Sequence, residues 1–127
     1  MRISKIVLLA LVTAWLAFTQ SLAPETSTPI VVQNMYWAKP GKAEEVYQWR
    51  LHASDVRVKL GLKRGRVLRR QGDSSTLPDV LWECEYPSAA ERAKDVATTG
   101  QSAEFKQVQE HMQTLTSQFD RIVLQAN

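Results

Sequence analysis

"VLWECEYPSAAE" (residues 80–91) joins a strand to a helix, and this junction decides the fold. Residues 80–86 are rich in β-branched and aromatic side chains, which predicts a strand, and Pro87 ends it. Ser88 and Glu91 have the spacing of a capping box, in which each side chain binds the backbone N–H of the other residue. The stretch therefore predicts a strand that is followed at once by a helix.

The same stretch contains Cys84, the single cysteine of the chain, between two glutamates. Because side chains alternate across a strand, Glu83 and Glu85 point away from Cys84, and the three groups cannot converge on one metal ion. No metal site is predicted here. Cys84 is expected to be a small buried apolar residue on the same side of the strand as Trp82 and Tyr86.

Outward from this junction, the sequence predicts alternating strands and helices. In chain order they are a strand at 30–37, a helix opened by Pro40 and Gly41 that runs to about 60, strands at 66–71 and 80–86, a helix that ends near 97, a second helical segment capped by Ser102, and a strand at 119–125. TTGQ (98–101) is expected to separate the two helical segments. In the first helix, a 3, 4, 3, 4 spacing predicts one buried apolar stripe of Val46, Trp49, Ala53, Val56 and Leu60. The order βαββαβ with right-handed crossovers predicts an α+β, ferredoxin-like fold: an antiparallel four-stranded sheet with helices on one face.

The other face of such a sheet has no helix over it. In a monomer, Leu81, Phe119 and Val123, or their neighbours, would be exposed to water. A second copy packed face to face would cover them, so the sequence predicts a homodimer.

Residues 56–72 contain seven cations and no acid. One interpretation is an anion-binding site. The other is pairing of Arg66, Arg69 and Arg70 with acids such as Glu83 and Glu85 on the adjacent strand. The second is favoured, because a hairpin places the opposite charges on neighbouring strands.

The N-terminal residues predict export of the protein. Residues 1–23 combine a positive start, a short apolar run and small residues before a cleavage site after Ala23, which is typical of a secretory signal peptide. The apolar run is shorter than the roughly 20 residues that a spanning helix needs, so a cleaved signal is favoured over a stable membrane anchor. Residues 24–29 are a linker, and residues 30–126 are the folded domain. A periplasmic or secreted location follows.

Charge gives no sign of a nucleic-acid partner. The whole chain has a net charge of +3, and removing residues 1–23 takes away Arg2 and Lys5, which leaves 14 cations against 13 acids. Nucleic-acid binding modules are strongly basic, and this domain is nearly neutral.

The chain resembles the dimeric α+β barrel superfamily, which has a ferredoxin-like fold. The resemblance covers nearly all of residues 30–126 and rests on NMYWAKPGKAEEV (34–46), LWECEYPSAAERA (81–93) and SAEFKQVQEHM (102–112). It is similar to the antibiotic-biosynthesis-monooxygenase-like and NIPSNAP-like branches. The resemblance implies a dimer. It also implies a range of activities, because the superfamily includes cofactor-free monooxygenases, haem-degrading enzymes, isomerases and aldehyde-processing enzymes.

Haem degradation is not predicted. That branch uses an asparagine in the first strand, which Asn34 matches, with a tryptophan and a histidine in the last helical region. This sequence has TTGQS where the tryptophan is expected before EFKQ, and Gln109 at the histidine position, with His111 two residues further on. No cofactor is therefore expected.

The candidate site residues are two histidines and three strand residues. His52 and His111 are expected at the rim of the helix–sheet interface as catalytic groups, because a histidine can move a proton near neutral pH. Asn34, Trp82 and Tyr86 are expected to line a pocket for a small, mostly apolar molecule. Two functions stay open: an exported small-molecule-binding domain, which includes a cofactor-independent monooxygenase-like enzyme, and a non-catalytic dimerisation or stress-associated module.

Overall fold

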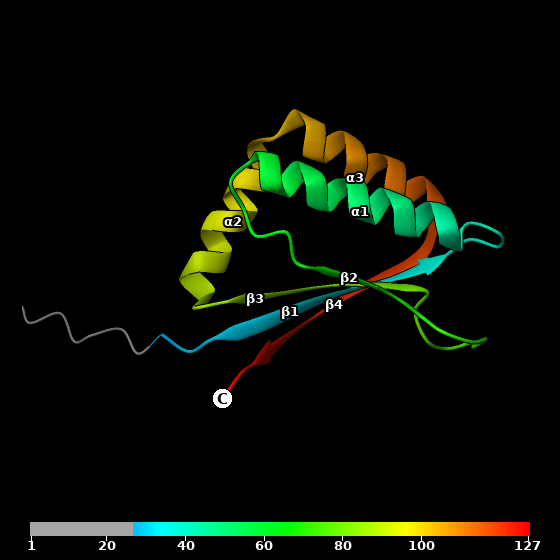
Figure 1. Ribbon diagram of the computed structural model, residues 1–127, viewed down its shortest axis with the longest axis horizontal. Helices are drawn as coiled ribbons and strands as arrows, with labels where there is room; N and C mark the ends of the chain where they lie inside the picture. Colours follow the sequence, from blue (N-terminus) through cyan, green and yellow to red (C-terminus); the bar gives the residue numbers. More distant parts are fainter. Residues whose placement is uncertain (1–26) are drawn as a thin grey trace, which may run out of the picture.

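The computed structural model describes residues 27–127, and its elements alternate in the predicted order (Figure 1). They are β1 (Ile30–Ala38), α1 (Ala43–Lys59), β2 (Arg66–Arg69), β3 (Val80–Tyr86), α2 (Ala89–Gln101), α3 (Ala103–Leu115) and β4 (Thr116–Gln125). The strands form one antiparallel sheet in the order β2-β3-β1-β4, and the helices lie together on one side of it. The predicted α+β, ferredoxin-like fold is confirmed.

The predicted signal peptide and the start of the linker lie outside the described residues. Within residues 27–127, no helix is long and apolar enough to cross a membrane.

The junction after β3 forms largely as predicted. Ser88 caps α2, because its Oγ accepts the backbone N–H of Glu91 at 3.2 Å. The other predicted hydrogen bond of the capping box, from the Ser88 backbone N–H to the Glu91 side chain, does not form. The Glu91 carboxylate pairs with the Lys94 ammonium at 2.9 Å instead. An ion pair one turn along the helix competes with a hydrogen bond to the cap.

TTGQ does not break the helix, and that prediction is wrong. α2 continues through Gly100 to Gln101 and ends at Ser102, whose backbone is extended and whose Oγ accepts the N–H of Phe105. A glycine inside a helix costs about 1 kcal/mol relative to alanine, which the helix can tolerate. The hydroxyls of Thr98 and Thr99 bond to backbone carbonyls of the same helix.

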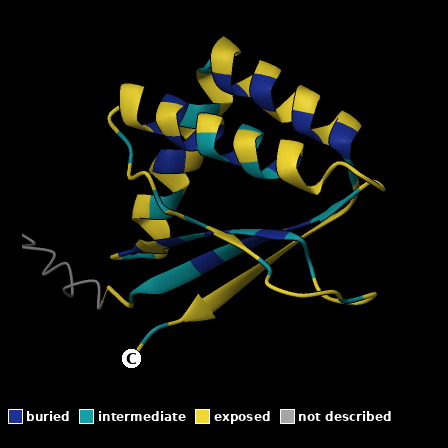
Figure 2. Ribbon diagram, turned by 45° about the vertical axis from the view of Figure 1, so that its right-hand side comes forward, coloured by how far each residue is buried: buried dark blue, intermediate teal, exposed yellow. Residues whose placement is uncertain are grey.

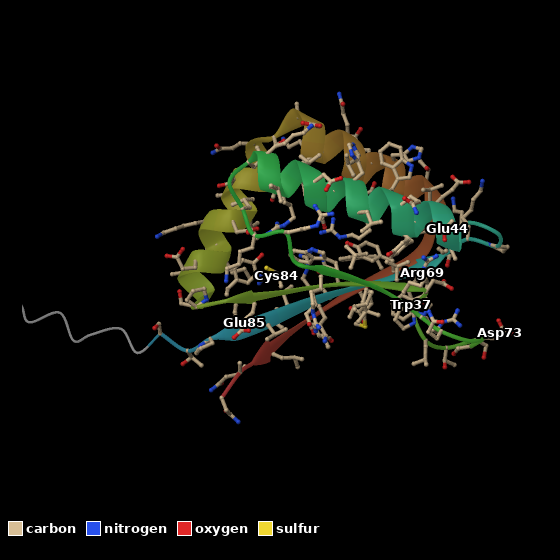
Figure 3. All side chains as sticks on the ribbon, viewed as in Figure 1. Trp37, Glu44, Arg69, Asp73, Cys84 and Glu85 are labelled. Carbon is tan, nitrogen blue, oxygen red and sulfur yellow. The ribbon has the colours of Figure 1, made fainter. Side chains whose placement is uncertain are left out.

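The side-chain alternation along β3 is confirmed. Trp82, Cys84 and Tyr86 are buried on the side that faces the helices. Figure 3 shows Cys84 and Glu85 on opposite sides of the strand. Cys84 is 3% exposed and unbridged, so it is a small core residue as expected.

The buried face of α1 differs from the predicted apolar stripe. Val46 and Ala53 are buried as expected, but Trp49 is only half-buried. Arg50 and Arg57 are each 3% exposed. Two cations therefore lie on the face of α1 that packs over the sheet, and their charges have to be accommodated inside the domain.

The sheet face without helices is partly apolar. Leu81 lies on this face as predicted, beside Met35 and Leu68 in adjacent strands. The prediction for β4 needs a correction, because Phe119 and Val123 pair with the helix-facing residues of β1, while Ile122 and Leu124 point to the open face. Nearly all residues of β4, an edge strand of the sheet, are exposed on both of its sides (Figure 2).

Six of the seven cations in residues 56–72 form ion pairs within the described chain, and Lys63 donates to the backbone carbonyl of Glu85 instead. The pairs are Arg57–Asp95, Lys59–Glu104, Arg64–Asp55, Arg66–Glu83, Arg69–Glu44 and Arg70–Asp79. Only Arg66 pairs with an acid on the adjacent strand in the predicted way. The others reach helices or the loop before β3, and Figure 3 shows Arg69 beside Glu44 at one end of α1.

Candidate functional site

A cavity of about 390 Å³ lies between the sheet and the helices. Its floor comes from β1, β3 and β4, and its walls come from α1, α2 and α3. The apolar lining is dominated by aromatic side chains, namely Tyr36, Trp82, Tyr86, Phe105 and Phe119. Ligand sites in proteins are typically concave, apolar and equipped with a few polar groups, and this cavity has those properties.

Three of the five predicted site residues line this cavity: Asn34, Trp82 and Tyr86. Asn34 is 9% exposed, and its Oδ1 accepts a hydrogen bond from Arg121 Nε at 2.7 Å. Its Nδ2 donates to the Tyr36 hydroxyl at 3.4 Å. These bonds orient the amide on the cavity floor, and the predicted grouping of the three strand residues is therefore present.

The two predicted histidines do not line the cavity. His52 and His111 are exposed and contact Trp49, with ring centroids 5.4 Å (edge to face) and 4.0 Å (tilted) from the indole. At 100° per residue, His52 is roughly 130° from the centre of the buried face of α1. The prediction that all five residues share one cavity is wrong. The buried face of α1 is centred on Val46 and Ala53 and has Trp49 at its edge, so His52 lies outside it.

Arg57 and Asp95 form a buried ion pair on one wall. Arg57 Nη1 donates to Asp95 Oδ1 at 2.9 Å, and Nη2 donates to Oδ2 at 2.6 Å. Arg57 Nε also donates to the backbone carbonyl of Lys63 at 2.8 Å. Burial alone would lower the pKa of Arg57, but the hydrogen bonds and charge of Asp95 outweigh it and raise that pKa. The carboxylate is fully engaged by one arginine.

Tyr86 lies beside this pair. Its hydroxyl accepts a hydrogen bond from Arg57 Nη2 at 3.4 Å. Burial raises the pKa of Tyr86 well above its ordinary value, and the nearby Arg57 charge opposes this only in part. The phenol is therefore neutral at physiological pH and acts as a hydrogen-bonding group.

Trp82 is held in place from two directions. Its indole Nε1 donates to the backbone carbonyl of Arg64 at 3.0 Å. The guanidinium carbons of Arg50 and Arg57 lie 4.7 Å and 4.6 Å from its ring centroid. A cation over an indole face is attracted by the electron density of the ring, so Trp82 is a partner for both buried charges.

Sequence reasoning missed the charged residues of the cavity. Val46, Arg50, Ala53 and Arg57 follow the 4, 3, 4 spacing of one helix face, so the pattern already placed both arginines with buried residues. The preference of arginine for the surface outweighed that signal. Nothing local identified Asp95, because it lies 38 residues from Arg57 in the sequence.

The chain is thus a ferredoxin-like α+β domain with a cavity between its sheet and its helices. No protein-family model and no curated protein matches this chain. Several solved structures do. A NIPSNAP family protein from Agrobacterium tumefaciens has a TM-score of 0.60 and 16% identity, covering 80% of this chain and 88% of that protein.

Two further matches have the same architecture. A dimeric protein of unknown function with a ferredoxin-like fold, from Bacteroides fragilis, has a TM-score of 0.59 and 8% identity, covering 77% of this chain and 96% of that protein. A proposed antibiotic biosynthesis monooxygenase from Bacteroides thetaiotaomicron has a TM-score of 0.52 and 13% identity, covering 80% and 89%. The ferredoxin-like fold that the resemblance implied is thus confirmed, and identities this low show the fold alone.

Proposed function

We propose that this protein binds a small, mostly apolar molecule in the cavity between its sheet and its helices. The observation that supports this best is the cavity itself, whose volume of about 390 Å³ is lined by aromatic side chains and a few polar groups. Ligand pockets typically measure roughly 300–1,000 Å³ and have this composition. Asn34 and Tyr86 provide hydrogen-bonding groups that orient a ligand at the floor.

The geometry favours binding over the finer hypothesis of a monooxygenase-like enzyme. One structural neighbour is described as a proposed antibiotic biosynthesis monooxygenase, so this fold is compatible with such an activity. The predicted mechanism needed a histidine to move a proton, but His52 and His111 lie outside the cavity. The alternative of a non-catalytic dimerisation module requires no ligand, so a binding experiment separates it from the proposed function.

Filling the cavity is expected to block binding. Thr99 lines the cavity and Thr98 does not, although both belong to α2 and both hydroxyls bond to backbone carbonyls. We expect Thr99→Phe to weaken any ligand found in a fragment screen by at least about tenfold, and Thr98→Phe to change it by less than about twofold. Ligand-detected NMR measures both. A screen that finds no binding fragment, or an equal loss of binding in the two variants, contradicts the proposal.

We further propose that the protein forms a homodimer through its open sheet face. The exposed apolar residues Leu68, Ile122 and Leu124 lie on this face, and the dimeric Bacteroides fragilis neighbour has the same fold. A symmetric dimer would bring this face against its own copy and remove its apolar side chains from water.

A charge on the open face is expected to dissociate that dimer. Light scattering at micromolar concentration should give the mass of two copies for the unmodified domain. Ile122→Glu should weaken association by roughly 100-fold or more, because each copy buries an unpaired charge. Val58→Glu is the control, since this exposed valine lies on α1, away from the open face. A monomeric parent protein would overturn the proposal.

The proposed location is outside the cytoplasm. It rests on the signal-like residues 1–23, which lie outside the described structure. Mass spectrometry of the exported protein is expected to find an N-terminus at Pro24. A mature product that retains Met1 would contradict it.

A further inference from the structure

Arg50 is a buried cation without a counter-charge in the described chain. It is 3% exposed, and it lines the cavity. Among residues 27–127 it makes no ion pair and no side-chain hydrogen bond, and its Nε is fully enclosed without a partner. Arg57, about two helical turns further along the same face of α1, donates two hydrogen bonds to Asp95 and one to the backbone carbonyl of Lys63. The two arginines therefore differ sharply in how their charge is compensated.

Burial of an uncompensated cation is strongly unfavourable. Loss of hydration lowers the pKa of Arg50 to about 10, so the guanidinium is still charged at neutral pH. The Trp82 ring, 4.7 Å away, compensates only part of this cost. A group that costs stability in the empty protein and faces a ligand-sized cavity has the properties of a binding group.

The cavity as a whole is positively charged. Four arginines and one aspartate line it, an excess of three positive charges. The aspartate, Asp95, is engaged by Arg57. The remaining arginines come from three different elements, since Arg50 is in α1, Arg92 in α2 and Arg121 in β4. Cations that surround an apolar cavity from several sides favour an anionic ligand by their summed potential.

We propose that the cavity binds a small organic carboxylate, with Arg50 as the counter-charge of its carboxylate and the aromatic side chains as the surface for its apolar body. This inference rests on the proposed binding function and specifies its ligand class. The planar guanidinium fork matches a carboxylate with two parallel hydrogen bonds. The aromatic walls, which include Trp82, Phe105 and Phe119, match a ring or an aliphatic chain better than inorganic phosphate.

Matched ligand pairs test the charge directly. Each pair has the same shape and differs in one charge, for example 2-naphthoate with 2-naphthamide and octanoate with octanamide. Titration calorimetry is done in a buffer low in chloride and free of other carboxylates, with inorganic phosphate as a separate probe. We expect the carboxylates to bind the unmodified protein at least about tenfold more tightly than their amides, and phosphate to bind more weakly than either carboxylate.

Arg50→Met removes the charge and keeps an apolar side chain of similar length. In this variant the preference for carboxylate over amide should fall to within about twofold, while amide binding persists. Arg64→Met is the control, because it removes one positive charge from an exposed residue that does not line the cavity. It should keep the full preference. The melting temperature of ligand-free Arg50→Met should be unchanged or higher, since the variant removes an uncompensated buried charge.

The outcomes separate this inference from the proposed function. If neither member of any pair binds, the binding function itself fails. If amides and carboxylates bind equally, or if Arg50→Met keeps the preference, the cavity binds ligands but Arg50 does not recognise an anion. A marked loss of melting temperature in ligand-free Arg50→Met would show that the charge is structural, and would also overturn the inference.

Discussion

Asp95→Asn is expected to lower the free energy of unfolding by about 3–5 kcal/mol, because it removes the counter-charge of a buried cation. Arg57 and Asp95 are 3% and 7% exposed, and two hydrogen bonds of 2.9 Å and 2.6 Å join them. An asparagine keeps the size of the side chain and can accept one of these bonds. It cannot neutralise the guanidinium, which then remains charged in the interior between α1 and α2.

Asp55→Asn is the matched control for this variant. Asp55 also pairs with an arginine, Arg64, but both side chains are about half exposed, at 56% and 49%. Water and salt screen an exposed pair, so Asp55→Asn should change the free energy of unfolding far less than Asp95→Asn. Urea denaturation of both variants gives the two free energies from the midpoints and slopes. Equal losses in the two variants would mean that burial does not determine the contribution of the Arg57–Asp95 pair.

Gly65→Ala is expected to destabilise the domain by about 3 kcal/mol or more, through strain and overpacking together. Gly65 has a φ of 71°, a region that side chains with a Cβ rarely adopt. A Cβ there would also meet the indole of Trp82, with its Cε2 at 2.6 Å and the carbonyl of Glu83 at 2.8 Å. Neither neighbour can move freely, because Trp82 is bonded to Arg64 and Glu83 belongs to β3.

The same substitution should change the cavity. Displacement of Trp82 removes the ring over which Arg50 and Arg57 lie. We therefore expect Gly65→Ala to alter the near-ultraviolet circular dichroism of the tryptophans and to weaken ligand binding along with stability.

Gly72→Ala separates strain from overpacking. Gly72 has a similar φ of 75°, but nothing lies within 4 Å of the position that its Cβ would occupy. The variant should cost only the conformational strain, about 1–2 kcal/mol, and should leave the tryptophan signal unchanged. The Gly65 prediction fails if both glycine variants lose the same stability in urea.

The sequence alone determined the order of the elements and the two faces of β3. Strand and helix periodicities are local patterns, and Pro87 and Ser88 mark a boundary by their own backbone chemistry. Alternation along one strand placed Trp82 and Tyr86 together on the helix-facing side, and both line the cavity. These parts of the prediction depend on patterns within a few residues of the chain.

The tertiary structure alone decided which helix residues face the cavity. His52 was expected there because Trp49 was counted as part of the buried stripe, but the packed helix is rotated toward Arg50 and Arg57. Sequence hydrophobicity does not foresee that rotation, because the burial of Arg57 depends on Asp95, a residue of another helix that neutralises its charge. The energetics of a buried charge depend on partners brought together by folding, and these partners are not adjacent in the chain.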